Sequence, residues 1–412
     1  MANYIDVLKE NKQEHLLNYL KMADETQKKE LINEIENINF EQLSELYKIS
    51  KRDNEKAIES QLIEHVKFVD KYKMSEEDFN KYKETGENII KNGEYAVVTM
   101  AGGQGTRLGH NGPKGTFLLD VKPKPKYLFE ILVDNIKRAN EKYGVTLNWY
   151  IMTSTENDAK TEEFFEEHNY FDYPKDKIKF FKQGNLPLIS EEGKLLVDEN
   201  FHIKYAADGN GCIYKSMRLD GVLDDMKQKG IKWVFIGAVD NALLNMVDPI
   251  LLGLTVCEGN QIGSKSVVKR SPEEPVGVFC KRNGKPGVIE YTELPTEMAH
   301  EVDDDGELLF GESHIMCNLY SIDAINKISK EKLPYHSAHK KAPFMNEKGE
   351  IVKATKPNAY KYEAFIFDGF AFFDNISILR GRRDEDFAPV KNAEGSDSPA
   401  TAVELYNNYW KV

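Results

Sequence analysis

The sequence contains the segment Met100-Ala-Gly-Gly-Gln-Gly-Thr-Arg-Leu-Gly-His-Asn-Gly-Pro-Lys-Gly115, which directly follows the β-rich run Tyr95–Met100. Three of its glycines, Gly102, Gly103 and Gly105, can adopt backbone angles that are closed to other residues, and they place no side chain between the backbone and a ligand. Successive backbone N–H groups in such a loop form a concave site for anions. The segment therefore predicts a phosphate-binding loop that follows a strand.

Two positively charged side chains in the same segment support this prediction. Arg107 can bind a phosphate through two parallel hydrogen bonds, and Lys114 supplies a compact positive charge. A Walker A loop requires G-x-x-x-x-G-K-[ST], which Lys114-Gly115 does not fit. A Rossmann fingerprint G-x-G-x-x-G that starts at Gly103 would require glycine at Leu108. Neither of these motifs therefore explains the segment.

Short β-rich runs alternate with amphipathic helical stretches along residues 95–239. The β-rich runs are Tyr95–Met100, Leu147–Met152, Ile178–Phe181 and Trp233–Val239, and the helical stretches include Tyr127–Tyr143 and Ala159–His168. This alternation predicts an α/β fold with a mostly parallel sheet flanked by helices. Ligands of such sheets bind at the carboxyl ends of the strands, so we expect the chemistry in loops that follow strands.

The length of 412 residues exceeds the size at which a single hydrophobic core keeps growing. Before residue 93 the chain is helical in pattern, and Ser75 begins a capping box for a helix that should end at Asn92-Gly93. From about Pro343, proline, glycine and charged residues cluster and the pattern loosens. We therefore expect an N-terminal helical region at residues 1–92, a catalytic domain at residues 93–342 and a small C-terminal α+β lobe at residues 343–412.

Composition and charge limit the possible partners. With 41% hydrophobic and 30% charged residues, the chain has the composition of an ordinary globular protein. Its net charge of −13 argues against nucleic acid or an anionic membrane as a partner, because both require a basic face. Small anionic substrates remain compatible with this charge, provided that positive charge is concentrated locally at the site.

Cysteine usage and the N-terminal residues predict the cellular location. The four cysteines lie far apart and form no C-x-x-C pair, which favours a reduced protein over a zinc or disulfide framework: Cys212, Cys257, Cys280 and Cys317. Residues Met1–Leu20 contain Lys, Glu, Asp and His and no apolar core, unlike a signal peptide. No stretch approaches the roughly 20 apolar residues that span a bilayer. We expect a cytoplasmic protein, either a monomer or a homodimer.

One acidic residue follows an apolar strand. Asp240 comes directly after the run Trp233–Val239, so it should lie at the carboxyl end of that strand. Mg²⁺ prefers one or two carboxylates together with phosphate oxygens, and this position is suited to such an ion. The alternative role for a lone aspartate here is a cap on the following helix.

Several further segments resemble one known family in their order and spacing. They are Gly102–Gly109, Pro113–Gly115, Tyr150–Ser154, Gln183–Pro187, Ala207–Gly211, Val239–Asn241, Glu274–Val278, Val288–Tyr291, Phe365–Asp368 and Pro389–Ala393. Together they resemble the signature of the UDP-N-acetylhexosamine pyrophosphorylases. The resemblance covers roughly residues 93–401.

This resemblance implies a Rossmann-like, GT-A-like nucleotidyltransferase fold and a Mg²⁺-dependent uridylyltransferase. UTP and an N-acetylhexosamine-1-phosphate (of glucosamine or galactosamine) would form the UDP-sugar and pyrophosphate. The alternatives are a UTP–glucose-1-phosphate or galactose-1-phosphate uridylyltransferase and a catalytically inactive regulatory paralogue. A dinucleotide-dependent oxidoreductase is a further option from another class.

The resemblance also implies roles for individual residues. The catalytic residues would be Arg107, Lys114 and Lys391, and the metal ligand Asp240. The nucleotide would contact Met100, Ala101, Gly102, Gly103, Gly105, Thr106, Gln183 and Gly209. The sugar would contact Asn210, Gly277, Glu290, Tyr291, Asn318, Phe365 and Phe367. Two of these assignments have alternatives, because Cys317 could occupy the aligned position instead of Asn318, and Phe365 and Phe367 could be plain core residues.

Overall fold

The computed structural model describes residues 4–51 and 62–412, which form two compact units. The first unit comprises residues 4–51, Gly184–Cys212 and Leu333–Ile366. The second comprises residues 62–183, Ile213–Lys332 and Phe367–Val412. Each unit is therefore built from segments that lie far apart along the chain.

These boundaries differ from the expected regions at residues 1–92, 93–342 and 343–412. Helix α6 (Glu76–Lys91) packs against α11 (Pro249–Cys257) and so belongs to the second unit, although it lies in the expected N-terminal region. Strand β20 (Ser377–Arg380) is part of the central sheet of that unit, although it lies in the expected C-terminal lobe. The reason is that burial of apolar side chains joins segments irrespective of their order in the sequence.

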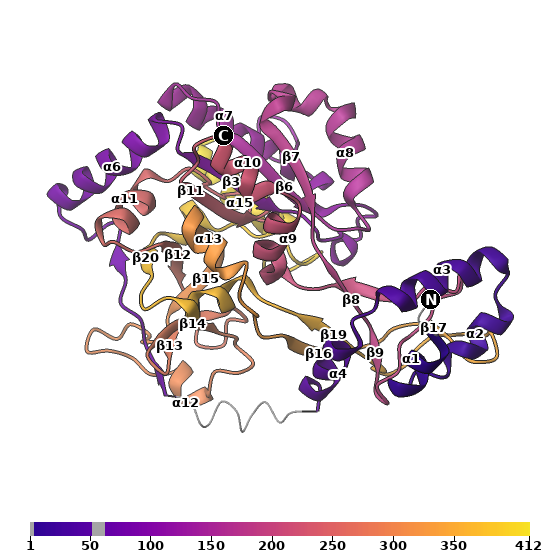
Figure 1. Ribbon diagram of the computed structural model, residues 1–412. Coiled ribbons are helices and arrows are strands. Elements are labelled where there is room, and N and C mark those ends of the chain that lie inside the picture. Colours follow the sequence, from indigo (N-terminus) through magenta and orange to yellow (C-terminus); the bar gives the residue numbers. More distant parts are fainter. Residues whose placement is uncertain (1–3, 52–61) are drawn as a thin grey trace. The chain divides into compact units, whose positions relative to one another are not determined.

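A mixed, mostly parallel sheet forms the centre of the second unit (Figure 1), and the predicted α/β class is confirmed. Its main path has the order β2 (Val69–Asp70), β20, β12 (Ile262–Val268), β15 (Glu312–Ser321), β11 (Trp233–Ala238), β3 (Tyr95–Met100), β6 (Asn148–Thr153) and β7 (Ile178–Lys182). On this path β15 is antiparallel to both of its neighbours, and the other pairs are parallel. A branch of antiparallel strands, β13 (Val278–Arg282), β14 (Lys285–Ile289) and β1 (Ile63–Glu64), extends from β15.

Helices cover both faces of this sheet. One face is packed against α6, α7 (Leu128–Tyr143), α8 (Asp158–Glu167), α11 and α15 (Pro399–Trp410), whose apolar residues share one core with the strands. Trp149 lies fully buried in that core, and its indole N–H donates to Thr99 Oγ1 at 2.8 Å. The other face meets α9 (Ile213–Leu219), α10 (Val222–Gln228) and α13 (Ile322–Ile328). There the Tyr150 hydroxyl donates to Asp225 of α10 at 2.7 Å, so the sheet is the middle of three layers.

Short elements complete the second unit. They are β4 (Leu118–Leu119), β5 (Lys126–Tyr127), α12 (Thr296–Ala299) and α14 (Arg383–Asp386). The predicted helix start at Ser75 is confirmed, because the Ser75 hydroxyl accepts a hydrogen bond from the backbone N–H of Asp78 at 3.0 Å. The predicted stop is confirmed as well, since Asn92 is the C-cap of α6.

The first unit packs helices around small antiparallel sheets. Its helices are α1 (Tyr4–Glu10), α2 (Leu16–Met22), α3 (Glu25–Asn37) and α4 (Phe40–Ile49). Its strands are β8 (Asn185–Pro187), β9 (Ile189–Ser190), β10 (Tyr205–Ala207), β16 (His336–Lys340), β17 (Phe344–Met345), β18 (Ile351–Val352) and β19 (Ala359–Glu363). Apolar residues of the helices, such as Leu31 and Leu46, share a core with strand residues such as Ile189 and Tyr362.

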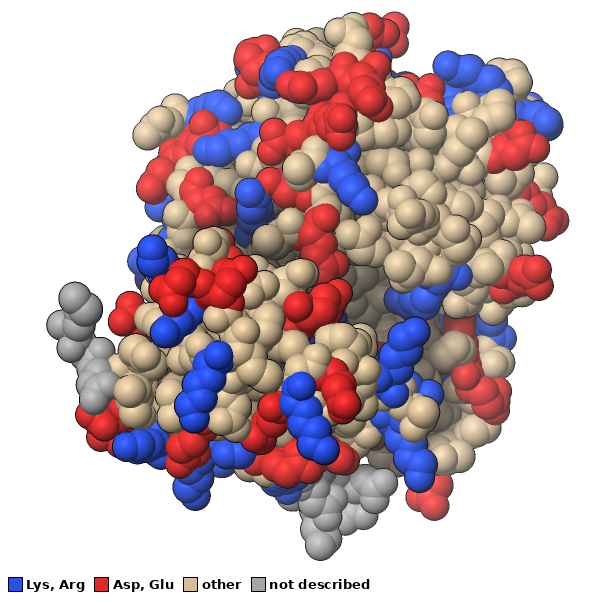
Figure 2. Space-filling model, turned by 90° about the vertical axis from the view of Figure 1, so that its right-hand side faces the viewer, with Lys and Arg blue, Asp and Glu red and all other residues tan. Residues whose placement is uncertain are grey.

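The surface carries charged side chains of both signs. Figure 2 shows one face of the molecule, on which acidic and basic side chains are interspersed. Every helix within residues 4–51 and 62–412 is either too short or too polar to cross a lipid bilayer.

Candidate active site

The parallel register places four loops at one edge of the sheet. Met100 at the end of β3 lies opposite Ala238 of β11 on one side and Met152 of β6 on the other. On β7, Lys182 lies opposite Thr153 of β6. The chain segments that follow these strands therefore leave the sheet together, as predicted for a site at the carboxyl ends of parallel strands.

The glycine-rich loop folds back on itself. The backbone N–H of Lys114 donates to the carbonyl of Gly103 at 3.0 Å, and the N–H of Gly105 donates to the carbonyl of Gly112 at 2.9 Å. These two bonds return the chain to its starting point, so Lys114 lies beside the first glycines of the loop. Arg107, in contrast, extends from an exposed turn between them.

A buried amide that the sequence did not single out holds the beginning of this loop. Asn157 is fully buried and donates from Nδ2 to the carbonyl of Ala101 at 2.9 Å. Its Oδ1 accepts from the N–H of Ser154 at 2.8 Å. Asn157 therefore joins the loop after β3 to the loop after β6. The only feature of the sequence that could have indicated this role is the presence of an amide residue four positions after a strand.

Two predicted nucleotide contacts lie against each other. A Cβ atom added to Gly102 would stand 2.7 Å from Gln183 Oε1, so the backbone of Gly102 lies directly against this amide, and any larger residue would displace it. The other predicted contacts of this loop differ in exposure: Met100 and Ala101 are buried, and Thr106 is exposed. Gly102 and Gln183 thus form one wall made of loop backbone and an amide side chain.

Lys114 and Asp240 form an ion pair, with Nζ 2.7 Å from Oδ2. Their side chains are 12% and 21% exposed, so the pair is largely but not completely shielded from water. Burial alone would raise the pKa of Asp240, but the positive charges of Lys114 and Lys391 outweigh it and hold this pKa below its ordinary value. Asp240 is therefore ionised near neutral pH under the influence of two cations.

The loop after β11 is joined to the segment that carries Lys391. Asn241 accepts from the N–H of Ala388 at 2.8 Å and donates from Nδ2 to the carbonyl of Asp386 at 2.7 Å. The N–H of Val390 donates to the carbonyl of Asp240 at 2.8 Å. These hydrogen bonds hold residues 386–390 beside the Asp240 loop and so bring Lys391, from the far end of the chain, near Asp240.

A buried cluster of charged side chains includes Asp386, one of the residues that Asn241 binds. Lys265 Nζ lies 2.6 Å from Asp248 Oδ2 and 2.6 Å from Asp386 Oδ1, and all three side chains are at least 95% buried. Burial alone would lower the pKa of Lys265, but the two carboxylates raise it well above its ordinary range. Lys265 is therefore charged, and it holds the carboxylate of Asp386 in place. The backbone carbonyl of the same residue accepts the hydrogen bond from Asn241.

Several predicted sugar contacts gather near β13, β14 and β15. A Cβ on Gly277 would stand 3.2 Å from Glu290 Oε1, so these two residues are neighbours. The ring of Phe367 lies 5.6 Å from that of His314, centroid to centroid, and Tyr291 is half exposed. The structure therefore brings Gly277 beside Glu290 and Phe367 beside His314, and the two pairs are joined, because the N–H of His314 donates to the carbonyl of Gly277 at 2.9 Å.

Asn318 does not reach the surface of this region. Its side chain is completely buried, and its Oδ1 lies 2.7 Å from Ser264 Oγ and 3.0 Å from His314 Nε2. The side chain therefore orients His314, which sequence reasoning did not single out. The alternative position, Cys317, is equally buried.

Three predicted contacts lie in the first unit. Gly209 has a positive φ of 95°, and the Oδ1 of Asn210 accepts from the N–H of Ile366 at 2.9 Å. The ring of Phe365 lies 4.7 Å from that of His336. The roles expected for Gly209, Asn210 and Phe365 stay predictions.

The donor set around Asp240 fits a divalent cation only together with a bound nucleotide. Within the described residues, no three His, Cys, Asp or Glu side chains come together to hold a metal ion. A single ionised carboxylate near two lysines would leave the remaining ligands to phosphate oxygens and water, as Mg²⁺ commonly accepts.

The chain is similar to several known proteins. The family model described as UTP–glucose-1-phosphate uridylyltransferase matches residues 38–406. The probable UDP-N-acetylglucosamine pyrophosphorylase of Dictyostelium discoideum is 35% identical, over 100% of this chain and 89% of that protein. The UDP-N-acetylglucosamine pyrophosphorylase of Saccharomyces cerevisiae is 38% identical, over 79% of this chain and 71% of that protein. The crystal structure of the uridine diphosphate N-acetylglucosamine pyrophosphorylase from Trypanosoma brucei, in complex with an inhibitor, is 31% identical with a TM-score of 0.82, and the match covers 98% of this chain and 84% of that chain.

The burial of His314 predicts a pH-dependent stability. Burial lowers its pKa to about 4; the hydrogen bond to Asn318 opposes this shift and Lys391 adds to it. The unfolded chain, with an ordinary pKa of about 6.5, binds a proton that the folded chain does not, so the free energy of unfolding should fall as the pH drops from about 6.5 towards 4, by up to about 3 kcal/mol. The measurement is the free energy of unfolding in urea at pH 7 and at pH 5. The fall between these two values should be smaller in His314→Gln than in the parent protein.

If the free energy of unfolding depends on pH equally in His314→Gln and in the parent protein, His314 is not the source of this pH dependence.

Proposed function

Because the chain belongs to the UTP–glucose-1-phosphate uridylyltransferase family, we propose that it joins UTP to N-acetylglucosamine-1-phosphate and releases pyrophosphate. It is a nucleotidyltransferase of the UDP-N-acetylglucosamine pyrophosphorylase type. The observation that carries the proposal is the position of Lys114 beside Asp240 at the end of the glycine-rich loop. We also propose a cytoplasmic location; the four cysteines, all of which are free thiols, support it.

The reaction is an in-line displacement at the α-phosphorus of UTP. An oxygen of the sugar-1-phosphate forms a new bond to this phosphorus, and the bond to the bridging oxygen of the pyrophosphate group breaks. The attacking oxygen is already ionised near neutral pH, so no general base is needed. Catalysis then depends on alignment and on positive charge where negative charge develops.

Several residues of the second unit bind the nucleotide and place positive charge at the reacting phosphates. Backbone N–H groups of the glycine-rich loop and Arg107 bind the triphosphate, and Gln183 beside Gly102 recognises the uracil. Lys114 exchanges Asp240 for a phosphate oxygen when the nucleotide binds. Lys391, held near Asp240 by the Asn241 contacts, adds positive charge from the other side of the reacting phosphates.

Asp240 is the residue that would hold Mg²⁺. When bound, the cation would neutralise phosphate charge and stabilise the pyrophosphate leaving group. Asp240 would supply one ligand, and its low pKa keeps it available as a carboxylate at the pH of the cell.

The test of the proposed function is a substrate panel. The protein is incubated with UTP, Mg²⁺ and one of four sugar phosphates: the 1-phosphates of N-acetylglucosamine, N-acetylgalactosamine, glucose and galactose. Pyrophosphate release should be fastest with N-acetylglucosamine-1-phosphate. Faster release with glucose- or galactose-1-phosphate would replace the proposed substrate, and release with none of them would favour an inactive paralogue.

Lys114→Ala should lower kcat by at least about 100-fold, because it removes one preorganised charge from the reacting phosphates. The control is Lys126→Ala, since Lys126 forms a similarly shielded ion pair with Asp134 in the same unit. Steady-state pyrophosphate release measures both. If Lys114→Ala turns over at the rate of Lys126→Ala, Lys114 has no part in the mechanism.

Asp240→Asn should raise the Mg²⁺ concentration that gives half-maximal rate, because an amide oxygen binds a hard dication more weakly than a carboxylate does. The measurement is a Mg²⁺ titration at saturating UTP, with Asp134→Asn as the control. An unchanged half-maximal concentration would mean that the cation binds elsewhere.

A further inference from the structure

Two loops of the second unit each carry one residue of the proposed site. The lysine loop (residues 390–397) carries Lys391, and the proline loop (residues 269–277) ends at Gly277, beside Glu290. A side-chain ion pair between Arg270 and Asp397, 127 positions apart in the sequence, connects the two loops. The mechanism described above makes no use of this pair.

The direction of the Arg270 side chain is fixed within the proline loop. Glu274 Oε2 accepts from the backbone N–H of Arg270 at 2.6 Å, and Glu274 Oε1 lies 3.3 Å from the Arg270 Nε. Arg383 Nη2 donates to the same carboxylate at 2.9 Å. Glu274 is 89% buried, so the carboxylate holds the guanidinium of Arg270 towards the lysine loop.

The lysine loop closes on the backbone of Asp397. Its carbonyl accepts from the N–H of Lys391 at 2.7 Å and from the N–H of Asn392 at 3.1 Å. Asp397 has a positive φ of 56°, a conformation that aspartate and asparagine tolerate better than most residues. Ser398 then caps α15. The position of Lys391 therefore depends on Asp397.

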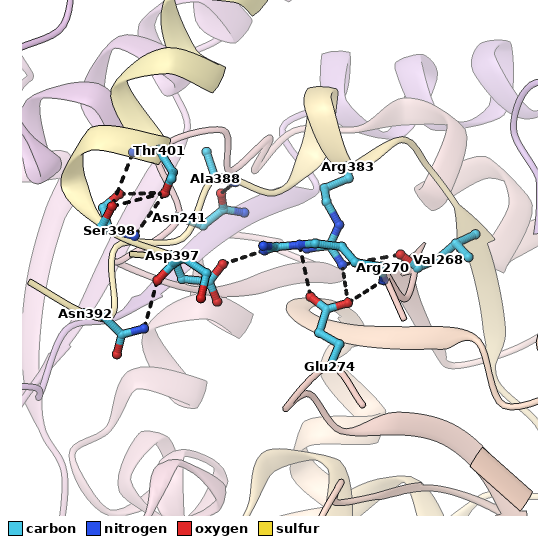
Figure 3. A network of polar contacts seen from close by, with 11 residues as sticks. Asn241, Val268, Arg270, Glu274, Arg383, Ala388, Asn392, Asp397, Ser398 and Thr401 are labelled. Atoms are coloured by element: carbon cyan, nitrogen blue, oxygen red, sulfur yellow. Dashed lines mark hydrogen bonds and ion pairs between the residues drawn. The ribbon is translucent and has the colours of Figure 1, made fainter. Parts of the chain in front are cut away.

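The Arg270 Nη2 lies 2.6 Å from Asp397 Oδ1, and Figure 3 shows this contact, with Glu274 below Arg270 and Asn392 to the lower left of Asp397 in the view. We propose that Arg270 is a positioning residue that holds Lys391 in place through Asp397 and ties it to the loop that ends at Gly277. This inference rests on the proposed function of Lys391.

The chemistry of the contact suits arginine. A guanidinium offers donors in a rigid fork, so one side chain can bind Glu274 and Asp397 at once, whereas a lysine ammonium has no such fixed geometry. Arg270 and Asp397 are 45% and 22% exposed, and ion pairs this open to water contribute little to global stability. The effect of losing the pair should therefore appear in the order of the lysine loop and in catalysis.

Arg270→Gln should lower kcat by about 10- to 100-fold, the loss expected when a reacting group is misplaced by about 1 Å. KM for UTP should change little, and Arg270→Lys, which keeps the charge, should recover part of the rate. The control is Lys232→Gln, because Lys232 forms an equally short ion pair with Glu94 at the opposite, amino-terminal edge of the sheet. Equal rates in Arg270→Gln and Lys232→Gln would overturn the proposal.

Double variants test whether Arg270 acts through Lys391. Asp397→Asn keeps the tolerance of positive φ and removes the charge, so its effect should not add to that of Arg270→Gln. In a Lys391→Ala background, Arg270→Gln should cost no further loss of kcat. Fully additive losses in either pair would overturn the proposal.

Hydrogen exchange separates this inference from the proposed function. In the free protein, Arg270→Gln should speed amide exchange in a peptide that spans residues 388–398, and Lys232→Gln should not. Unchanged exchange would overturn the inference. Faster exchange together with a fully active Lys391→Ala variant would sustain the contact and remove Lys391 from the mechanism instead.

Discussion

The hydrogen bonds between the parallel strands β3 and β11 set the position of the candidate site. Because Met100 lies opposite Ala238, the glycine-rich loop and Asp240 leave the sheet at the same edge and at the same height. Both faces of the sheet are covered by helices, so each strand residue has a fixed core on its own side. A slip of one residue would turn every side chain to the opposite face, and burial therefore holds the register that places Lys114 next to Asp240.

Electrostatics explains how an acidic chain can build the site that we propose for phosphates. The net charge is −13, yet two lysines lie near Asp240, and their fields exceed the effect of burial on its pKa. The Lys114–Asp240 pair also spares each side chain the cost of a partly buried, unpaired charge. The same two residues can thus be stable in the free protein and be available for the phosphate and cation of the proposed reaction.

Two buried amide side chains hold the loops of the candidate site in place through hydrogen bonds. Asn157 and Asn241 are both buried, and each uses its oxygen as an acceptor and its nitrogen as a donor for backbone groups of loops. Buried backbone groups need such partners, and an amide can serve two at once. The Arg270–Asp397 pair performs a similar role nearer to solvent, with charged groups.

The sequence by itself determined the α/β class and the limits of helix α6, and it predicts a phosphate-binding role for the glycine-rich loop. These features depend on local rules, namely hydrophobic periodicity, backbone freedom at glycine and the capping of Ser75. Only the tertiary structure decided that residues 184–212 and 333–366 join the N-terminal helices, and that Asn318 is buried behind His314. These outcomes depend on contacts between segments that are far apart in the chain. A local stretch of sequence does not specify which distant residues will cover its apolar side chains or hydrogen-bond its buried polar groups.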